Sequence, residues 1–188
     1  SWVLDMLKTG GLPTGTTLHY WWVIQDAAGG RLETAQQQVD FNDNRYQWRS
    51  VSQGNIALYW YQGDNNFAGQ LMTAAQQAVT RLERDTGARL ERPIKLYIYA
   101  NAQDLQGSMI FPSEWTGGVA FTPYGIIAIG IAPANLGWGQ RTIAHELTHL
   151  GVHQMTYNPY NELPTWLDEG LAVYNEGPAD PVFTALLN

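Results

Sequence analysis

Hydrophobic and polar positions follow two different periods along this chain, and the change between them falls near residue 62. In residues 16–40, β-branched and aromatic side chains lie on either side of the turn-forming run 27–30. This pattern predicts a β-hairpin. Residues 56–61 alternate in the same way and predict a further strand.

From residue 64 onward the apolar positions recur at helical spacing. Asp64 suits the N-cap of this helix and Gly87 suits its end. The apolar positions between them are Phe67, Leu71, Ala74, Ala75, Ala78 and Leu82. The sequence then predicts strands over 93–100, 117–122 and 125–132, a short helix over 101–107, and helices over 141–154 and 166–174, with Pro164 as a first helical residue.

These elements predict an α+β fold with a mixed sheet. We expect residues 1–62 to form a β-rich accessory segment, which could be part of an Ig-like sandwich. Residues 63–188 then form a second domain, which we expect to be truncated at its C-terminus.

Composition excludes several classes of protein. The 188 residues include no cysteine, which excludes a disulfide scaffold, thiolate zinc ligands and thiol catalysis. The net charge of −7 argues against a nucleic-acid partner. No run reaches the roughly 20 apolar residues of a membrane span. The first residues lack a basic and an apolar region, so we expect no signal peptide in this stretch.

Charged residues are distributed unevenly. Residues 142–188 contain no lysine or arginine, six acids and three of the four histidines. Acids and histidines without bases indicate a cation site, and the alternative is a solvated acidic face.

The run from His145 to His149 has the pattern HExxH. On a helix, His145 and His149 lie about 40° apart in azimuth and about 6 Å apart along the axis, so both rings can reach one ion. Glu146 lies beside that ion and can polarise a bound water. Imidazole and carboxylate ligands suit zinc.

A second motif follows the first with 19 residues between His149 and Glu169. It runs from Leu163 to Ala172 and reads LPTWLDEGLA. HExxH followed by this WLxEGxA pattern resembles the gluzincin clan of zinc metallopeptidases, and in particular the bacterial peptidase MA-like domains. The resemblance covers residues 141–177 closely and 63–188 more loosely.

The resemblance implies a gluzincin-like lobe in which His145, His149 and Glu169 bind Zn²⁺ and Glu146 is the general base. Asp168 competes with Glu169 for the metal, but adjacent helical residues point about 100° apart, so only one can face it. We interpret Asp168 as a residue of the helix N-terminus, and Glu162 and Glu176 as solvated acids.

The sequence departs from the family at one position. Thermolysin-like members have an aspartate four residues after the ligand glutamate, which orients a ligand histidine, whereas this chain has Val173. The acidic partner of the ligand histidine must therefore come from another position.

The rival metzincin pattern does not fit this chain, because His153 lies about 12 Å along the helix axis from His145. We interpret His153 as a structural residue or a neighbour of a ligand, and it could also hydrogen-bond substrate.

The resemblance also implies a substrate-binding strand at the edge of the cleft. Gly118, Val119 and Ala120 occupy that place, and an ordinary hairpin strand is the alternative. The donor that stabilises the oxyanion is left open among Tyr124, Tyr157, Tyr160 and Tyr174. Four of the five tryptophans before residue 62 suggest either packing between strands or a sugar-stacking face: Trp21, Trp22, Trp48 and Trp60.

The leading hypothesis is a zinc metallopeptidase that acts on peptides or proteins. The alternative is a catalytically silent zincin-like domain used for binding or surface display. The resemblance implies an extracellular or cell-envelope location, and we expect further domains of the same chain.

Overall fold

The computed structural model describes residues 3–5, 8, 11–110, 112, 117–156 and 163–178. Its centre is a five-stranded mixed sheet in the order β5-β6-β7-β9-β8. The strands are β5 (Arg49–Gln53), β6 (Ile56–Trp60), β7 (Ile94–Tyr99), β8 (Gly118–Phe121) and β9 (Ile126–Gly130). β6, β7 and β9 are parallel, and the outer strands β5 and β8 run antiparallel to their neighbours. The predicted α+β fold with a mixed sheet is therefore confirmed.

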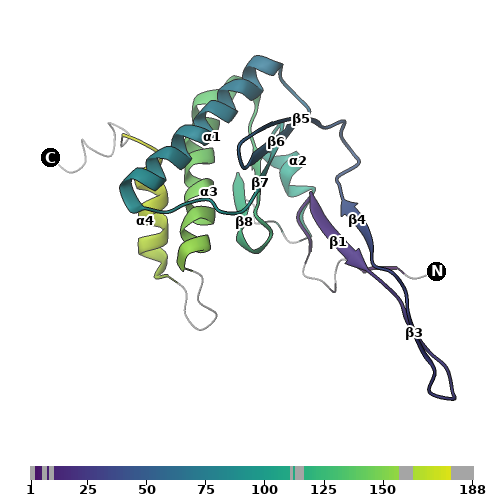
Figure 1. Ribbon diagram of the computed structural model, residues 1–188. Helices are drawn as coiled ribbons and strands as arrows, with labels where there is room; N and C mark the ends of the chain where they lie inside the picture. Colours follow the sequence, from purple (N-terminus) through teal and green to yellow (C-terminus); the bar gives the residue numbers. More distant parts are fainter. Residues whose placement is uncertain are drawn as a thin grey trace.

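Three helices lie together on one side of this sheet (Figure 1). They are α1 (Asn65–Thr86), α3 (Leu136–Thr156) and α4 (Thr165–Asn175). Alternate residues of β7, Ile94, Leu96 and Ile98, point toward α1 and α3 and are buried in one apolar cluster with them. This cluster fixes α3, and therefore the HExxH run, against the sheet.

The ends of α1 follow the sequence signals closely. The Asp64 carboxylate accepts a hydrogen bond from the amide of Phe67 at 2.8 Å. Gly87 ends the helix in the left-handed conformation, with φ 75°, which glycine adopts without a steric cost. The short helix α2 (Ala102–Gln106) has the same kind of cap, since Asn101 accepts from the amide of Asp104.

The opposite face of the sheet is packed with aromatic side chains. Tyr97 and Tyr99 of β7 point to this side, where Trp48 stacks edge-on against both. Tyr46 and Tyr61 stack face to face beside them. Trp48 therefore packs the sheet, as one of the two interpretations predicted, and Trp60 is buried on the helical side.

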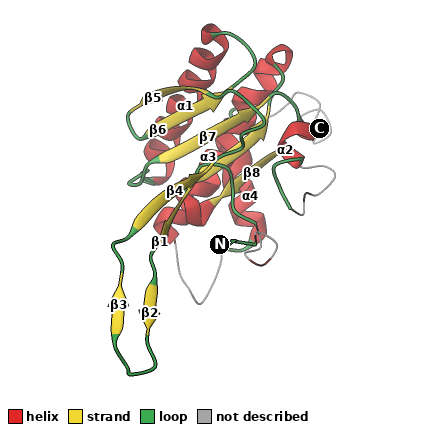
Figure 2. Ribbon diagram, turned by 90° about the vertical axis from the view of Figure 1, so that its right-hand side faces the viewer, coloured by secondary structure: helices red, strands yellow, loops and turns green. Residues whose placement is uncertain are grey.

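A two-stranded arm extends from this aromatic face (Figure 2). Its base pairs β1 (Thr16–Tyr20) with β4 (Gln37–Phe41), and its tip pairs β2 (Val23–Gln25) with β3 (Arg31–Glu33). The predicted hairpin over 16–40 is confirmed. Trp21 and Trp22 are about half exposed on this arm.

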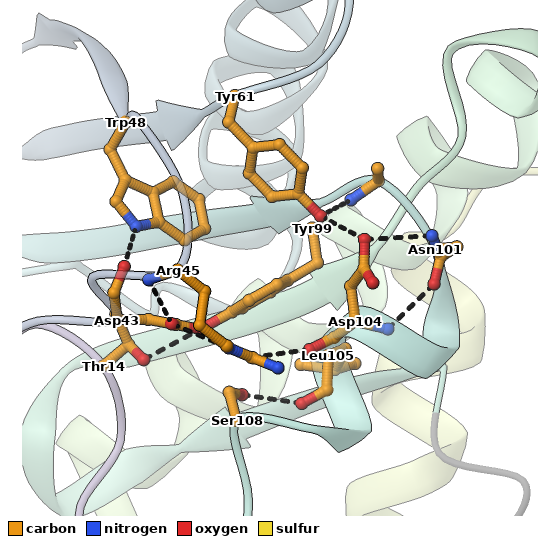
Figure 3. Close-up of polar contacts among 11 residues, drawn as sticks. Thr14, Asp43, Arg45, Trp48, Tyr61, Tyr99, Asn101, Asp104, Leu105 and Ser108 are labelled. Atoms are coloured by element: carbon orange, nitrogen blue, oxygen red, sulfur yellow. Dashed lines mark hydrogen bonds and ion pairs between the residues drawn. The ribbon is translucent and has the colours of Figure 1, made fainter.

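A polar network holds the base of the arm to the sheet (Figure 3). Asp43 accepts two hydrogen bonds from the Arg45 guanidinium, at 2.9 and 2.6 Å, and one from the Tyr99 hydroxyl at 3.2 Å. Because that hydroxyl donates to Asp43, Thr14 is the donor in its 3.0 Å bond to Tyr99. Burial among these groups raises the pKa of Tyr99 to about 12.

The sheet joins residues from both sides of position 62, since β5 and β6 precede it and β7 to β9 follow it. The division into 1–62 and 63–188, and the Ig-like assignment, stay predictions. In the part of the chain that the structure describes, no helix combines the length and apolarity that a membrane crossing needs.

Candidate metal centre

The HExxH run lies in the middle of α3, where the two histidines share one face. α4 packs against α3 and brings Glu169 to the same place. One carboxylate oxygen of Glu169 lies 3.3 Å from His145 Nε2, and the other lies 3.9 Å from His149 Nε2. Ligand atoms of these three residues all lie within 4.8 Å of one another.

This spacing fits a bound cation. Ligands at about 2.1 Å from a tetrahedral ion lie roughly 3.4 Å apart, close to the separations of the Nε2 and carboxylate atoms here. Glu169 is 53% exposed in its side chain, which leaves one side of the group open to a water or a substrate. His145, His149 and Glu169 are thus positioned to hold a metal ion.

The other ring nitrogens of the two histidines meet carboxylates of α4. His149 Nδ1 lies 2.9 Å from Asp168 Oδ2, and His145 Nδ1 lies 2.9 Å from Glu176 Oε1. With the proton on Nδ1, each ring donates to its carboxylate and leaves the lone pair of Nε2 for the metal.

Asp168 lies in the first turn of α4, as the sequence predicted, but its side chain also bonds His149, which the sequence did not indicate. One interpretation from the sequence is wrong at this point. Glu176 was expected to be solvated, but it contacts both His145 and Arg141. The partner missing at Val173 is therefore supplied one turn later, by Glu176.

Glu146 points from α3 toward the edge strand β8, and it is buried. Burial raises the pKa of its carboxyl, and the charge of Glu169 adds to that effect. His145, His149 and a hydrogen bond from the backbone amide of Ala120 act in the opposite direction and leave the pKa raised. A carboxyl with a raised pKa next to a metal group is suited to accept and release a proton.

The family model described as the Peptidase MA superfamily matches residues 74–188, more than half of the chain. The chain belongs to the Peptidase MA superfamily. No curated protein sequence matches the chain significantly. The matched range contains both helices of the metal group and the edge strand.

In this peptidase MA domain, β8 approaches Glu146 very closely. A Cβ atom at Gly118 would lie 2.9 Å from Glu146 Oε1 and 3.1 Å from Thr142 Cγ2. A side chain at position 118 would therefore displace the Glu146 carboxylate. β8 pairs with β9 on one side and is the last strand of the sheet. Gly118, Val119 and Ala120 therefore lie on an edge strand beside the metal group.

The remaining candidates divide into four sets. His153 is not a member of the metal-ligating group found among the described residues. Tyr174 lies five residues after Glu169, about 140° around α4, which directs it away from the metal group. Tyr124 is partly exposed in the turn after β8. Tyr157, Tyr160 and Glu162 lie outside the described residues.

Proposed function

We propose that this domain is a zinc-dependent peptidase of gluzincin type. The observation that carries the proposal is the grouping of His145, His149 and Glu169 with the buried carboxyl of Glu146 next to it. Two imidazoles and one carboxylate, with an open fourth position, are the ligand set of catalytic zinc sites. Zinc bound there would polarise the peptide carbonyl and activate a water molecule as the nucleophile.

Glu146 takes the proton of the attacking water and passes it to the amine of the leaving peptide. The amide of Ala120 holds its carboxylate in place during this transfer. Asp168 and Glu176 hold the two histidine rings with their Nε2 atoms toward Glu169, so that the ligand set needs little reorganisation.

The substrate in this proposal is an extended peptide that pairs with β8. Backbone groups on an edge strand can bind a peptide as an additional strand, without strong preference for its side chains. Gly118, Val119 and Ala120 would bind the substrate backbone, next to Glu146. An extracellular or cell-envelope location stays a prediction.

The test compares the wild type with Glu146→Gln. We expect both proteins to bind one equivalent of zinc, measured by elemental analysis after dialysis. Only the wild type should cleave a mixed peptide library, with products identified by mass spectrometry. A wild type that binds no stoichiometric zinc, or a Glu146→Gln protein that cleaves as fast as the wild type, would contradict the proposal.

The alternative function was a catalytically silent binding or display domain. One argument for it was Val173, which leaves His145 without the usual acidic partner. Glu176 supplies such a partner, so this argument no longer favours the alternative. A wild type that holds zinc and cleaves no peptide of the library would support it.

A further inference from the structure

We infer that Glu176 is a positioning residue that orients His145 as a metal ligand, together with Arg141; this inference rests on the proposed function. It assigns a role in the metal centre to two residues that contribute no ligand atom.

The imidazole of His145 is held at both nitrogens. Nδ1 lies 2.9 Å from Glu176 Oε1, and Nε2 lies 3.3 Å from Glu169 Oε2. Both partners in the first contact are well covered, with side-chain exposures of 22% and 19%. In this partly buried setting a charge-assisted hydrogen bond fixes the plane of the ring and its tautomer.

The second oxygen of Glu176 is also engaged. Arg141 Nε lies 3.3 Å from Glu176 Oε2, and Arg141 is on α3, one turn before His145. The carboxylate therefore lies between a guanidinium and an imidazole that belong to the same helix. This arrangement restricts rotation of the carboxylate and keeps Oε1 directed at His145.

The backbone before Glu176 is anchored by the buried side chain of Asn175. Its amide nitrogen donates to Thr148 Oγ1 of α3 at 2.7 Å and to the carbonyl of Ala78 in α1 at 3.3 Å. The Asn175 carbonyl accepts a 2.6 Å bond from Arg81. These bonds join the end of α4 to both neighbouring helices, so the backbone from which the Glu176 side chain extends is held in place.

Helix geometry explains why position 176 serves this role. A residue seven positions after Glu169 returns to within about 20° of its azimuth, two turns further along the axis. Val173, four positions after Glu169, is largely exposed. α4 packs on α3 with its C-terminal end beside His145 and its first turn beside His149, as the Glu176 and Asp168 contacts show. The acid that orients the histidine thus lies about one turn further along α4 than position 173, where thermolysin-like members have their aspartate.

The test measures zinc affinity rather than activity. Zinc dissociation constants are determined by competition with a chromophoric chelator for the wild type, Glu176→Gln, Glu176→Ala and Arg141→Gln. The matched control is Glu83→Gln, because Glu83 of α1 also pairs with an arginine, Arg89, which follows the end of that helix. Thermal unfolding of each metal-free protein reports any purely structural effect.

We expect Glu176→Ala to weaken zinc binding by about 10–100-fold, and Glu176→Gln and Arg141→Gln to weaken it less. The control should bind zinc as the wild type does. Histidine ¹⁵N spectra of the zinc-loaded protein should show an altered Nδ1 signal of His145 in Glu176→Ala. This spectroscopic change is not expected from a residue that only stabilises the fold.

A Glu176→Gln and a Glu176→Ala protein that fold and bind zinc as tightly as the wild type would overturn the inference. So would an equal loss of affinity in Glu83→Gln. A wild type that binds zinc without cleaving peptides overturns the peptidase proposal alone, since the affinity comparison still reports on Glu176. A wild type that binds no zinc overturns both.

Discussion

At the scale of single residues, the candidate metal centre contains side chains that suit the proposed chemistry but lower the stability of the fold. Glu146 is the clearest case, because its carboxylate is buried and accepts a hydrogen bond from the backbone amide of Ala120. A buried carboxylate is costly when ionised, and the raised pKa is the signature of that cost.

We therefore expect Glu146→Gln to stabilise the metal-free protein near pH 7. An acid whose pKa is higher in the folded state favours folding while it is protonated, and this contribution is lost as the pH rises through the folded pKa. The difference in unfolding temperature between variant and wild type should thus be positive near pH 7 and disappear near pH 4, where the unfolded-state carboxyl is protonated. Thermal scans in the presence of a chelator measure it. An equal gain at both pH values would show that charge is not the cause.

Gly118 acts on the same carboxylate from the edge strand. Alanine at this position would place its Cβ 2.9 Å from Glu146 Oε1, so the carboxylate must move. We expect Gly118→Ala to lower kcat by about 10–100-fold, because catalysis is sensitive to a displacement of this size. Zinc content should not change. The measurement is steady-state peptide cleavage, and unchanged kcat in a folded variant would contradict the role of this close approach.

At the scale of elements, local signals in the sequence were sufficient for most helices and strands. Asp64 and Gly87 mark the ends of α1 because a cap acts within a few residues of itself. The shared position of His145 and His149 could be predicted equally well, since the two residues lie one turn apart on one helix. The contacts of Asp168 and Glu176 with the histidines could not be predicted from the sequence, because they depend on how α4 packs against α3. Their partners are 19 and 31 residues away in the chain.

Helix α1 also contains a glycine at a position where alanine would favour the helix more. Gly69 lies on the exposed side of the helix interior, and apart from its chain neighbours and the nearby backbone of α1, a Cβ there would have no atom within 4 Å. Glycine costs about 1 kcal/mol relative to alanine inside a helix. Gly69→Ala should therefore raise the free energy of unfolding by about 0.5–1 kcal/mol without affecting zinc affinity. Urea denaturation measures this change, and a destabilised variant would mean that α1 needs flexibility at this turn.

At the scale of the whole molecule, the described chain consists of a lobe that contains the candidate metal centre and an arm that the polar network holds to the far side of the sheet. Sequence patterns predicted the hairpin of the arm but not its attachment. That attachment joins Thr14, Asp43 and Arg45 to Tyr99 of β7 and to the backbone of Asp104, and such contacts across the chain leave no local pattern.

Asp43 is the residue on which this attachment depends. Burial acts to raise the pKa of its carboxyl, but hydrogen bonds from the side chain and backbone of Arg45, the charge of Arg45 and the Tyr99 hydroxyl outweigh burial and leave the pKa lowered. The Asp43 side chain is only 8% exposed, so its bonds are shielded from solvent. Asp43→Asn should lower the free energy of unfolding near pH 7 by about 1–3 kcal/mol, because charged hydrogen bonds are lost and a guanidinium is left without its carboxylate.

The pH dependence distinguishes this charge effect from a packing defect. An acid whose pKa is lower in the folded state contributes stability above its unfolded pKa of about 4, and this contribution is lost as the pH falls through the folded value. The free energy of unfolding of Asp43→Asn should therefore fall below that of the wild type by the largest amount near pH 6. This difference should shrink steadily below about pH 4. Denaturant titrations across this range measure it, with Asp85→Asn as a control for an exposed acid paired with an arginine. A difference that stays constant down to low pH would mean that Asp43 supports the arm by its shape alone, and that its ionised carboxylate does not join the arm to the sheet.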